Sequence, residues 1–179
     1  MLTKIWIGWA IWRNWVSPTR HDDWPSFHWM YPHWTNLYEC PHLFTGATLR
    51  CGSCYIEYYG IPSFIGNLVL LTDLDLSYTI IQGPINGPAF ATLSKLTYLD
   101  IGGNSYKSTI PSEIYTLPLL ERLYIQESDI SGNLEFIKEM PNIFEIWIDR
   151  NPGLKGTIPT EIGSVSSLGS ISLSGCSFK

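Results

Sequence analysis

The sequence predicts a repeat solenoid of the α/β type, in which one short strand from each repeat stacks into a parallel sheet. Three observations point to this fold. An apolar motif recurs at a nearly fixed interval, a small and mostly polar residue follows it at a fixed distance, and most repeats continue into an apolar tail. The clearest copy runs from Leu96 through Asn104 to Leu117. A unit of this length buries its apolar side only against its neighbours, so the repeats must stack.

The period defines the domain organisation. The motif begins at Leu71, Leu96, Leu120, Ile143 and Leu168, which lie 25, 24, 23 and 25 residues apart. One period earlier, a sixth motif is expected to begin near position 46. We therefore expect a repeat domain over residues 46–179, with an incomplete last repeat, and a separate segment over residues 1–45.

Each motif is expected to form a short strand. In the copy at Leu96, the side chains of Leu99 and Ile101 point inward, whereas those of Tyr98 and Asp100 point to the opposite, open side. The tails contain Ile-Pro pairs, as at Ile110, and proline favours an extended or 3₁₀-like path away from the sheet. The solenoid should therefore have a sheet on one side and 3₁₀ turns and loops on the other.

The ninth position of each motif holds a small and mostly polar residue. Such residues can bond the backbone groups of a buried turn, so we expect a structural ladder. Its members are Cys54, Thr79, Asn104, Ser128, Asn151 and Cys176.

The cysteines allow two interpretations. Cys40, Cys51 and Cys54 lie close enough in sequence for Cys40 to form a disulfide with one of the other two in an oxidising compartment. However, Cys51 occupies a core position of the repeat and Cys54 a ladder position, which favours buried thiols. Both interpretations remain open at the sequence level.

The first 45 residues differ in composition from the repeats. They contain seven of the eight tryptophans and all four histidines. Aromatic residues there could contact a membrane surface or a partner, or they could form an aromatic-rich cap that shields the end of the solenoid. The histidines match no common zinc spacing, so no metal or other cofactor is expected.

Composition argues against two kinds of partner. The formal charge is −5, only 15% of residues are charged, and no basic run occurs, so nucleic acid is not an expected ligand. The apolar run from Ile5 to Trp12 is shorter than the roughly 20 residues that span a bilayer. No cleavage site for a signal peptide follows it, and no N-glycosylation sequon occurs in the chain.

The segment NPGLKGTIPTEIGSVSSL, from Asn151 to Leu168, carries a resemblance. It is similar to plant-type leucine-rich repeats of receptor-kinase ectodomains and polygalacturonase-inhibiting proteins, and GTIPTEIG also resembles repeats of algal and diatom surface proteins. The resemblance covers roughly residues 46–179. It implies a right-handed superhelix, a concave parallel sheet, a second short sheet, and a location outside the cell or at its surface.

A candidate binding surface follows from the register, because the outward positions of stacked strands form columns on the concave face. Large aromatic and charged side chains gather in the middle repeats. The predicted ligand-binding residues are Asp75, Tyr98, Asp100, Arg122, Tyr124, Glu145, Trp147 and Asp149.

We interpret this surface as an aromatic centre with an acidic rim, suited to a basic peptide or protein segment. Stacking of a carbohydrate on Tyr124 and Trp147 is the rival interpretation. A third is that the aromatic residues only stack on one another across strands.

These observations favour a non-enzymatic recognition module. An open face offers carboxylates no enclosure that would raise a pKa, and no nucleophile elbow, phosphate loop or metal motif is present. The alternative is a structural subunit of a larger extracellular or multiprotein complex. Such a subunit would dock through its tryptophan-rich N-terminus and through a partner at its open C-terminal end.

Overall fold

The computed structural model describes residues 44–45, 47–53 and 59–179. All of them belong to the second of two compact units, Asn36–Lys179. Most of the expected N-terminal segment lies outside the described residues, and so do its tryptophans and histidines, Cys40 and Cys54. Within the described part, no helix is long and apolar enough to cross a membrane.

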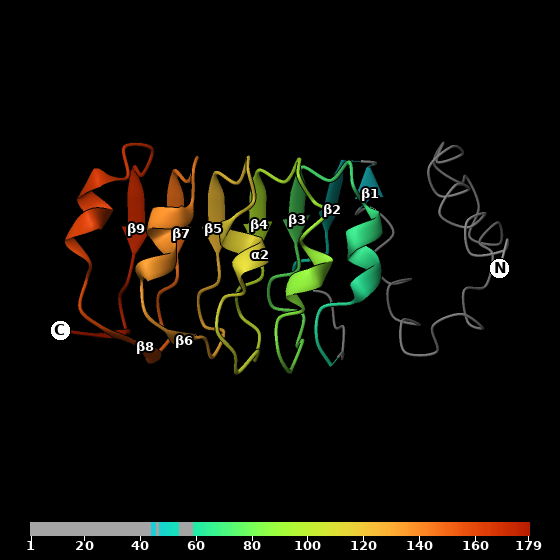
Figure 1. The fold of residues 1–179 in the computed structure, drawn as a ribbon. Coiled ribbons are helices and arrows are strands. Elements are labelled where there is room, and N and C mark those ends of the chain that lie inside the picture. Colours follow the sequence, from blue (N-terminus) through green and yellow to red (C-terminus); the bar gives the residue numbers. More distant parts are fainter. Residues whose placement is uncertain (1–43, 46, 54–58) are drawn as a thin grey trace, which may run out of the picture. The chain divides into compact units, whose positions relative to one another are not determined.

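One long sheet runs through the repeats, with its strands side by side in a single row (Figure 1). Each repeat contributes three residues at the place that the motif predicts. Its parallel strands are β2 (Thr48–Arg50), β3 (Asp73–Asp75), β4 (Tyr98–Asp100), β5 (Arg122–Tyr124), β7 (Glu145–Trp147) and β9 (Ser170–Ser172).

The register of this sheet confirms the predicted solenoid. Leu74 pairs with Leu99, Leu99 with Leu123, and Leu123 with Ile146, so equivalent positions of successive repeats stand side by side. The sequence did not predict β1 (Phe44–Thr45), which pairs with β2 as an antiparallel hairpin at the sheet edge. No periodic apolar pattern marks so short a strand.

The core lies behind the sheet. Leu74, Leu99, Leu123 and Ile146 are completely buried, and they pack with the apolar residues of the tails into one continuous cluster. Each such side chain contributes about 1.5–3 kcal/mol by leaving water. The alternation of inward and outward residues therefore determines which face of each strand is covered.

Short helical turns form the opposite, convex side, and Figure 1 shows them on one side of the strands. They are η3 (Ser63–Asn67), η4 (Gly87–Ala89), α2 (Ser112–Tyr115), η5 (Glu135–Glu139) and η6 (Thr160–Ser164), where η denotes a 3₁₀ helix. Pro62, Pro111 and Pro159 precede three of them in extended conformation, as their fixed φ angle favours. The prediction of 3₁₀ turns is confirmed except at α2, which is a single α-helical turn.

A second, smaller sheet accompanies the later repeats, as the resemblance implied. It consists of β6 (Ser131–Gly132), β8 (Gly153–Gly156) and β10 (Ser177–Phe178), all parallel. Single bridges from Tyr59 to Gln82 and from Gln82 to Ser105 occur in the earlier repeats.

The asparagines of the ladder tie neighbouring repeats together. Asn104 Oδ1 accepts hydrogen bonds from the backbone N–H groups of Thr79 (3.2 Å) and Ile81 (3.0 Å) in the preceding repeat. Its Nδ2 donates to the carbonyls of Leu76 (2.9 Å) and Ile101 (3.0 Å). The side chain thus replaces solvent for backbone groups that the turn would leave buried and unpaired.

Asn151 repeats this arrangement two ladder steps further along, after Ser128. It accepts from the N–H groups of Ser128 and Ile130, both at 3.0 Å, and donates to the carbonyl of Ile125 at 2.7 Å. At the last ladder position, the Sγ atom of Cys176 lies 3.2 Å from the carbonyl oxygen of Ile148. A thiol therefore takes the place of the amide there.

The structure contradicts a disulfide between Cys40 and Cys51. Cys40 and Cys54 lie outside the described residues, so a disulfide between these two stays a prediction. Cys51 is a free thiol with 1% of its surface exposed. Its side chain belongs to the apolar core, and burial, reinforced by the charge of Asp75, raises the pKa of the thiol to about 11. Cys51 therefore behaves as a small apolar core residue.

Candidate functional site

The sheet brings the predicted ligand-binding residues together on its concave face. Tyr98, Arg122 and Glu145 are consecutive members of one column, because each pairs with the next across the strands. Asp100, Tyr124 and Trp147 form the adjacent column in the same way. The central six residues of the prediction therefore occupy three neighbouring strands, β4, β5 and β7.

Three aromatic rings form a continuous row across these strands, which we call the aromatic row. The ring of Tyr98 meets that of Tyr124 edge to face, with centroids 5.4 Å apart and planes at 87°. Tyr124 lies against Trp147 at 4.9 Å and 31°. Such contacts contribute roughly 0.5–1.5 kcal/mol beyond burial and hold each ring in place.

The aromatic row ends in an accessible indole. Trp147 keeps 42% of its surface exposed, whereas Tyr98 and Tyr124 are half-buried. The Tyr124 hydroxyl donates to the Glu145 carboxylate at 2.6 Å. Burial, together with Glu145, raises the pKa of Tyr124 to about 12, so the phenol remains a hydrogen-bond donor at neutral pH. The row is therefore a rigid apolar platform with one open end.

The neighbouring aspartates are less available than the sequence suggested. Asp75 accepts from the backbone N–H and the hydroxyl of Ser77 at 3.0 and 2.7 Å. Asp100 accepts from the Gly102 N–H at 3.0 Å, and Asp149 pairs with Arg150 at 3.1 Å. Asp75 and Asp100 therefore stabilise the turns after their own strands, and Asp149 is paired with a guanidinium, so all three are only partly free to meet a ligand.

Two arginines flank the aromatic row, of which the sequence predicted only Arg122 as a ligand-binding residue. The Arg122 guanidinium lies 5.9 Å from the centre of the Tyr98 ring, and that of Arg50 lies 5.8 Å from it. Arg50 also pairs with Asp73 at 3.4 Å. Arg50 stands in the same predicted column as Asp100, and this placement was the signal that could have identified it.

Asp100 makes the stability of this face depend on pH. Burial raises its pKa from an ordinary 3.8 to about 6, and the charge of Asp75 adds to the effect, although the Gly102 N–H opposes it. The folded state therefore binds this proton more tightly than the unfolded state does. The resulting stabilisation is complete below about pH 4 and disappears as the pH rises through about 6.

We expect Asp100→Asn to be more stable than the parent chain at pH 7, by on the order of 1 kcal/mol, because no charge is then buried. Near pH 4 the two proteins should have nearly equal free energies of unfolding. Urea denaturation across this pH range measures the difference. A difference that stays constant between pH 4 and 7 would contradict the assignment.

Comparison with known proteins supports the repeat assignment. A family model described as Leucine Rich Repeat matches residues 95–117. Receptor like protein 28 from Arabidopsis thaliana is 30% identical over 131 residues, covering 69% of this chain and 17% of that protein. Receptor like protein 24 from the same plant is 37% identical over 115 residues, covering 64% of this chain and 13% of that protein. The chain thus spans less than a fifth of the length of either relative.

Solved structures agree with these relatives. The plant peptide hormone receptor RGFR1 in complex with RGF2 is similar with a TM-score of 0.68 and 29% identity, over 76% of this chain and 22% of that one. The ectodomain of the receptor kinase SOBIR1 from Arabidopsis thaliana is similar with a TM-score of 0.65 and 26% identity. This similarity covers 74% of this chain and 73% of that one. The repeat register, the family model and these similarities show a leucine-rich repeat solenoid whose repeats resemble those of plant receptor proteins.

Proposed function

We propose that the chain is a recognition module whose concave face binds a peptide or protein segment at the cell surface, without catalysis. The observation that carries the proposal is the aromatic row of Tyr98, Tyr124 and Trp147. Aromatic side chains held rigidly by their neighbours lose little entropy on binding, and they dominate many interfaces. The exposed indole of Trp147 is the proposed anchor.

The groups around the row indicate what kind of segment would fit. Arg122 is exposed on one side, while Glu145 is already bonded to Tyr124. Because Asp75 and Asp100 bond to their own turns and Asp149 is paired with Arg150, a strongly basic ligand is less favoured than the sequence suggested. We therefore propose an extended segment that places an apolar side chain against Trp147 and polar groups near Arg122 and Glu145.

The similarity to solved receptors supports this direction. RGFR1 is described in complex with RGF2, and another similar structure, PEPR1-AtPEP1, shares 28% identity with a TM-score of 0.62. A carbohydrate stacked on Tyr124 and Trp147 is the alternative, because a sugar ring also packs on an aromatic face.

The proposal is tested with peptides selected against the intact chain from a random display library. Replacing both Tyr124 and Trp147 with alanine should weaken binding of the selected peptides at least tenfold. Truncation of an interface anchor typically costs more than about 1–2 kcal/mol of binding free energy. The affinity is measured by calorimetry. The double variant should stay folded, because these rings lie outside the core, but it should lose about 1–3 kcal/mol of stability with the two ring contacts.

Tyr59→Ala is the matched control. Tyr59 is an aromatic residue with 81% exposure that lies outside the main-sheet strands, so its loss should leave peptide affinity unchanged. Equal binding by the double variant would refute the proposed site. Selective binding of glycans from an array that the double variant loses, with no selectable peptide, would favour the carbohydrate alternative.

A further inference from the structure

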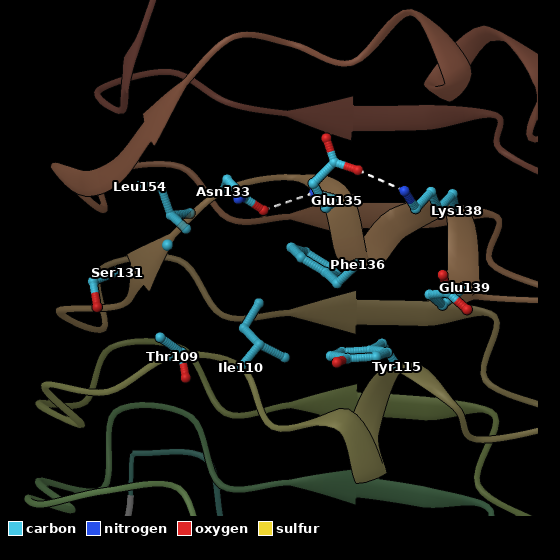
Figure 2. Close-up of a pocket in the computed structure, with 11 residues that line it drawn as sticks. Thr109, Ile110, Tyr115, Ser131, Asn133, Glu135, Phe136, Lys138, Glu139 and Leu154 are labelled. Atoms are coloured by element: carbon cyan, nitrogen blue, oxygen red, sulfur yellow. Dashed lines mark hydrogen bonds and ion pairs between the residues drawn. The ribbon is translucent and has the colours of Figure 1, made fainter.

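A separate hollow lies between the tails of two neighbouring repeats, away from the concave face. It has a volume of about 370 Å³, near the small end of the range for ligand pockets, about 300–1,000 Å³. Figure 2 shows that its lining comes from the tails and from the second sheet. The lining residues are Thr109, Ile110, Tyr115, Ser131, Gly132, Asn133, Glu135, Phe136, Lys138, Glu139 and Leu154.

The hollow adjoins a repeat with a shortened tail. In the repeat that begins at Leu96, the core residue Ile114 follows Ile110 after four positions. In the next repeat, Ile137 follows Leu134 after only three. The proline that should stand between them is replaced by Glu135, which already belongs to η5. This shorter tail is therefore the local irregularity beside which the space opens.

Apolar groups form the inner surface of the hollow. The rings of Tyr115 and Phe136 are in contact, with centroids 5.9 Å apart and planes at 34°, and both are half-buried. Ile110 and Leu154, which are both buried, also line the hollow. Because the rings come from adjacent tails, they present a partly open aromatic surface on which a flat apolar group can pack.

Polar groups surround this surface, and the hydrogen bonds they already make determine which donors and acceptors remain available for a ligand. Asn133 Oδ1 accepts from the Glu135 N–H at 3.0 Å, which leaves its Nδ2 as a donor. Lys138 Nζ pairs with Glu135 Oε2 at 2.6 Å. Glu139 has no hydrogen bond or ion pair with any residue that the structure describes. Thr109 and Ser131 add hydroxyl groups.

We propose that this hollow is a second binding site, which accepts one ring of a neutral sugar. A pyranose has an apolar face that packs on aromatic rings and hydroxyl groups that need both donors and acceptors. The hollow supplies an aromatic surface, a donor at Asn133 and an acceptor at Glu139. The carboxylates of Glu135 and Glu139 and the ammonium of Lys138 give the rim of the hollow a formal charge of −1. This charge disfavours binding of an anion.

A cationic side chain fits less well than a sugar. A cationic side chain needs only hydrogen-bond acceptors, whereas the hollow also presents a donor, the Asn133 amide. The ammonium of Lys138 would repel the cation. The proposed site shares no residue with the aromatic row of Tyr98, Tyr124 and Trp147. Its test therefore does not depend on whether the concave face binds a peptide.

The experiment uses the intact, nitrogen-labelled chain, titrated with the methyl glycosides of glucose, mannose, galactose and xylose. At least one glycoside should cause saturable shifts of the backbone amide signals of Gly132 and Asn133. Glu139→Gln and Asn133→Ala should each weaken this binding about tenfold, because the first replaces a charged acceptor with a weaker neutral one and the second removes the amide donor. Glu161→Gln, an exposed substitution on η6 outside the hollow, should leave it unchanged.

Three results would overturn the proposal. One is the absence of saturable shifts with all four glycosides. Another is equal affinity in Glu139→Gln, Asn133→Ala and the Glu161→Gln control. The third is saturable binding of lysine methyl ester or acetate at Gly132 and Asn133 with none of any glycoside, which would assign the hollow to an ion. Circular dichroism of each variant establishes that the comparison concerns folded protein.

Discussion

Replacing Asn104 with alanine is expected to lower the free energy of unfolding by about 3 kcal/mol or more. The side chain bonds the N–H groups of Thr79 and Ile81 and the carbonyls of Leu76 and Ile101 in the interior of the turn. Alanine leaves the N–H groups of Thr79 and Ile81 buried and unpaired, and each such group costs about 1–3 kcal/mol. Water could reach them only if the turn opened.

Urea denaturation followed by circular dichroism measures this loss. The matched control is Asn142→Ala, because Asn142 is exposed and donates a single hydrogen bond, to the carbonyl of Pro118. Asn142→Ala should change stability by less than about 0.5 kcal/mol. Similar losses in Asn104→Ala and Asn142→Ala would mean that the ladder does not hold the repeats together.

A comparable loss is expected when Leu123 is replaced with alanine. Leu123 is completely buried in β5, between Leu99 and Ile146 of the adjacent strands. Large-to-small substitutions at such sites cost about 2–5 kcal/mol, because they remove buried surface and leave a cavity. In a solenoid, stability depends on contacts between neighbouring repeats, so this cavity weakens the interfaces on both sides.

Leu119→Ala provides the comparison for Leu123. Leu119 is close in sequence but 48% exposed, and its truncation should cost less than about 1 kcal/mol. Chemical denaturation of both variants measures the two losses. If Leu123→Ala were tolerated as well as Leu119→Ala, the assignment of inward and outward positions would be wrong.

The main sheet could be predicted from the sequence because one constraint determines it. Each repeat must align its apolar residues with the equivalent residues of its neighbours. The period alone therefore places Leu74, Leu99 and Leu123 side by side. The same register brings Tyr98, Tyr124 and Trp147 onto one face. Strand pairing and the aromatic row are therefore direct consequences of the repeat.

Other features depend on local geometry that the period does not determine. The carboxylate of Asp100 was expected at an open rim, but it bonds the Gly102 N–H two residues along the chain. The hollow next to Phe136 depends on how a shortened tail packs. Strand β1, which pairs with β2 in a hairpin, is only two residues long. A motif search cannot find such features, because they arise from distances between side chains and backbone.

The most direct test of recognition by the concave face is hydroxyl-radical footprinting of the intact chain, with and without a selected peptide. Mass spectrometry reports the oxidation rate of each aromatic residue. Trp147 and Tyr124 should oxidise several times more slowly in the complex, because the ligand covers the aromatic row, while Tyr59 should be unchanged. A saturating peptide that leaves Trp147 as reactive as in the free chain would contradict the proposed binding face.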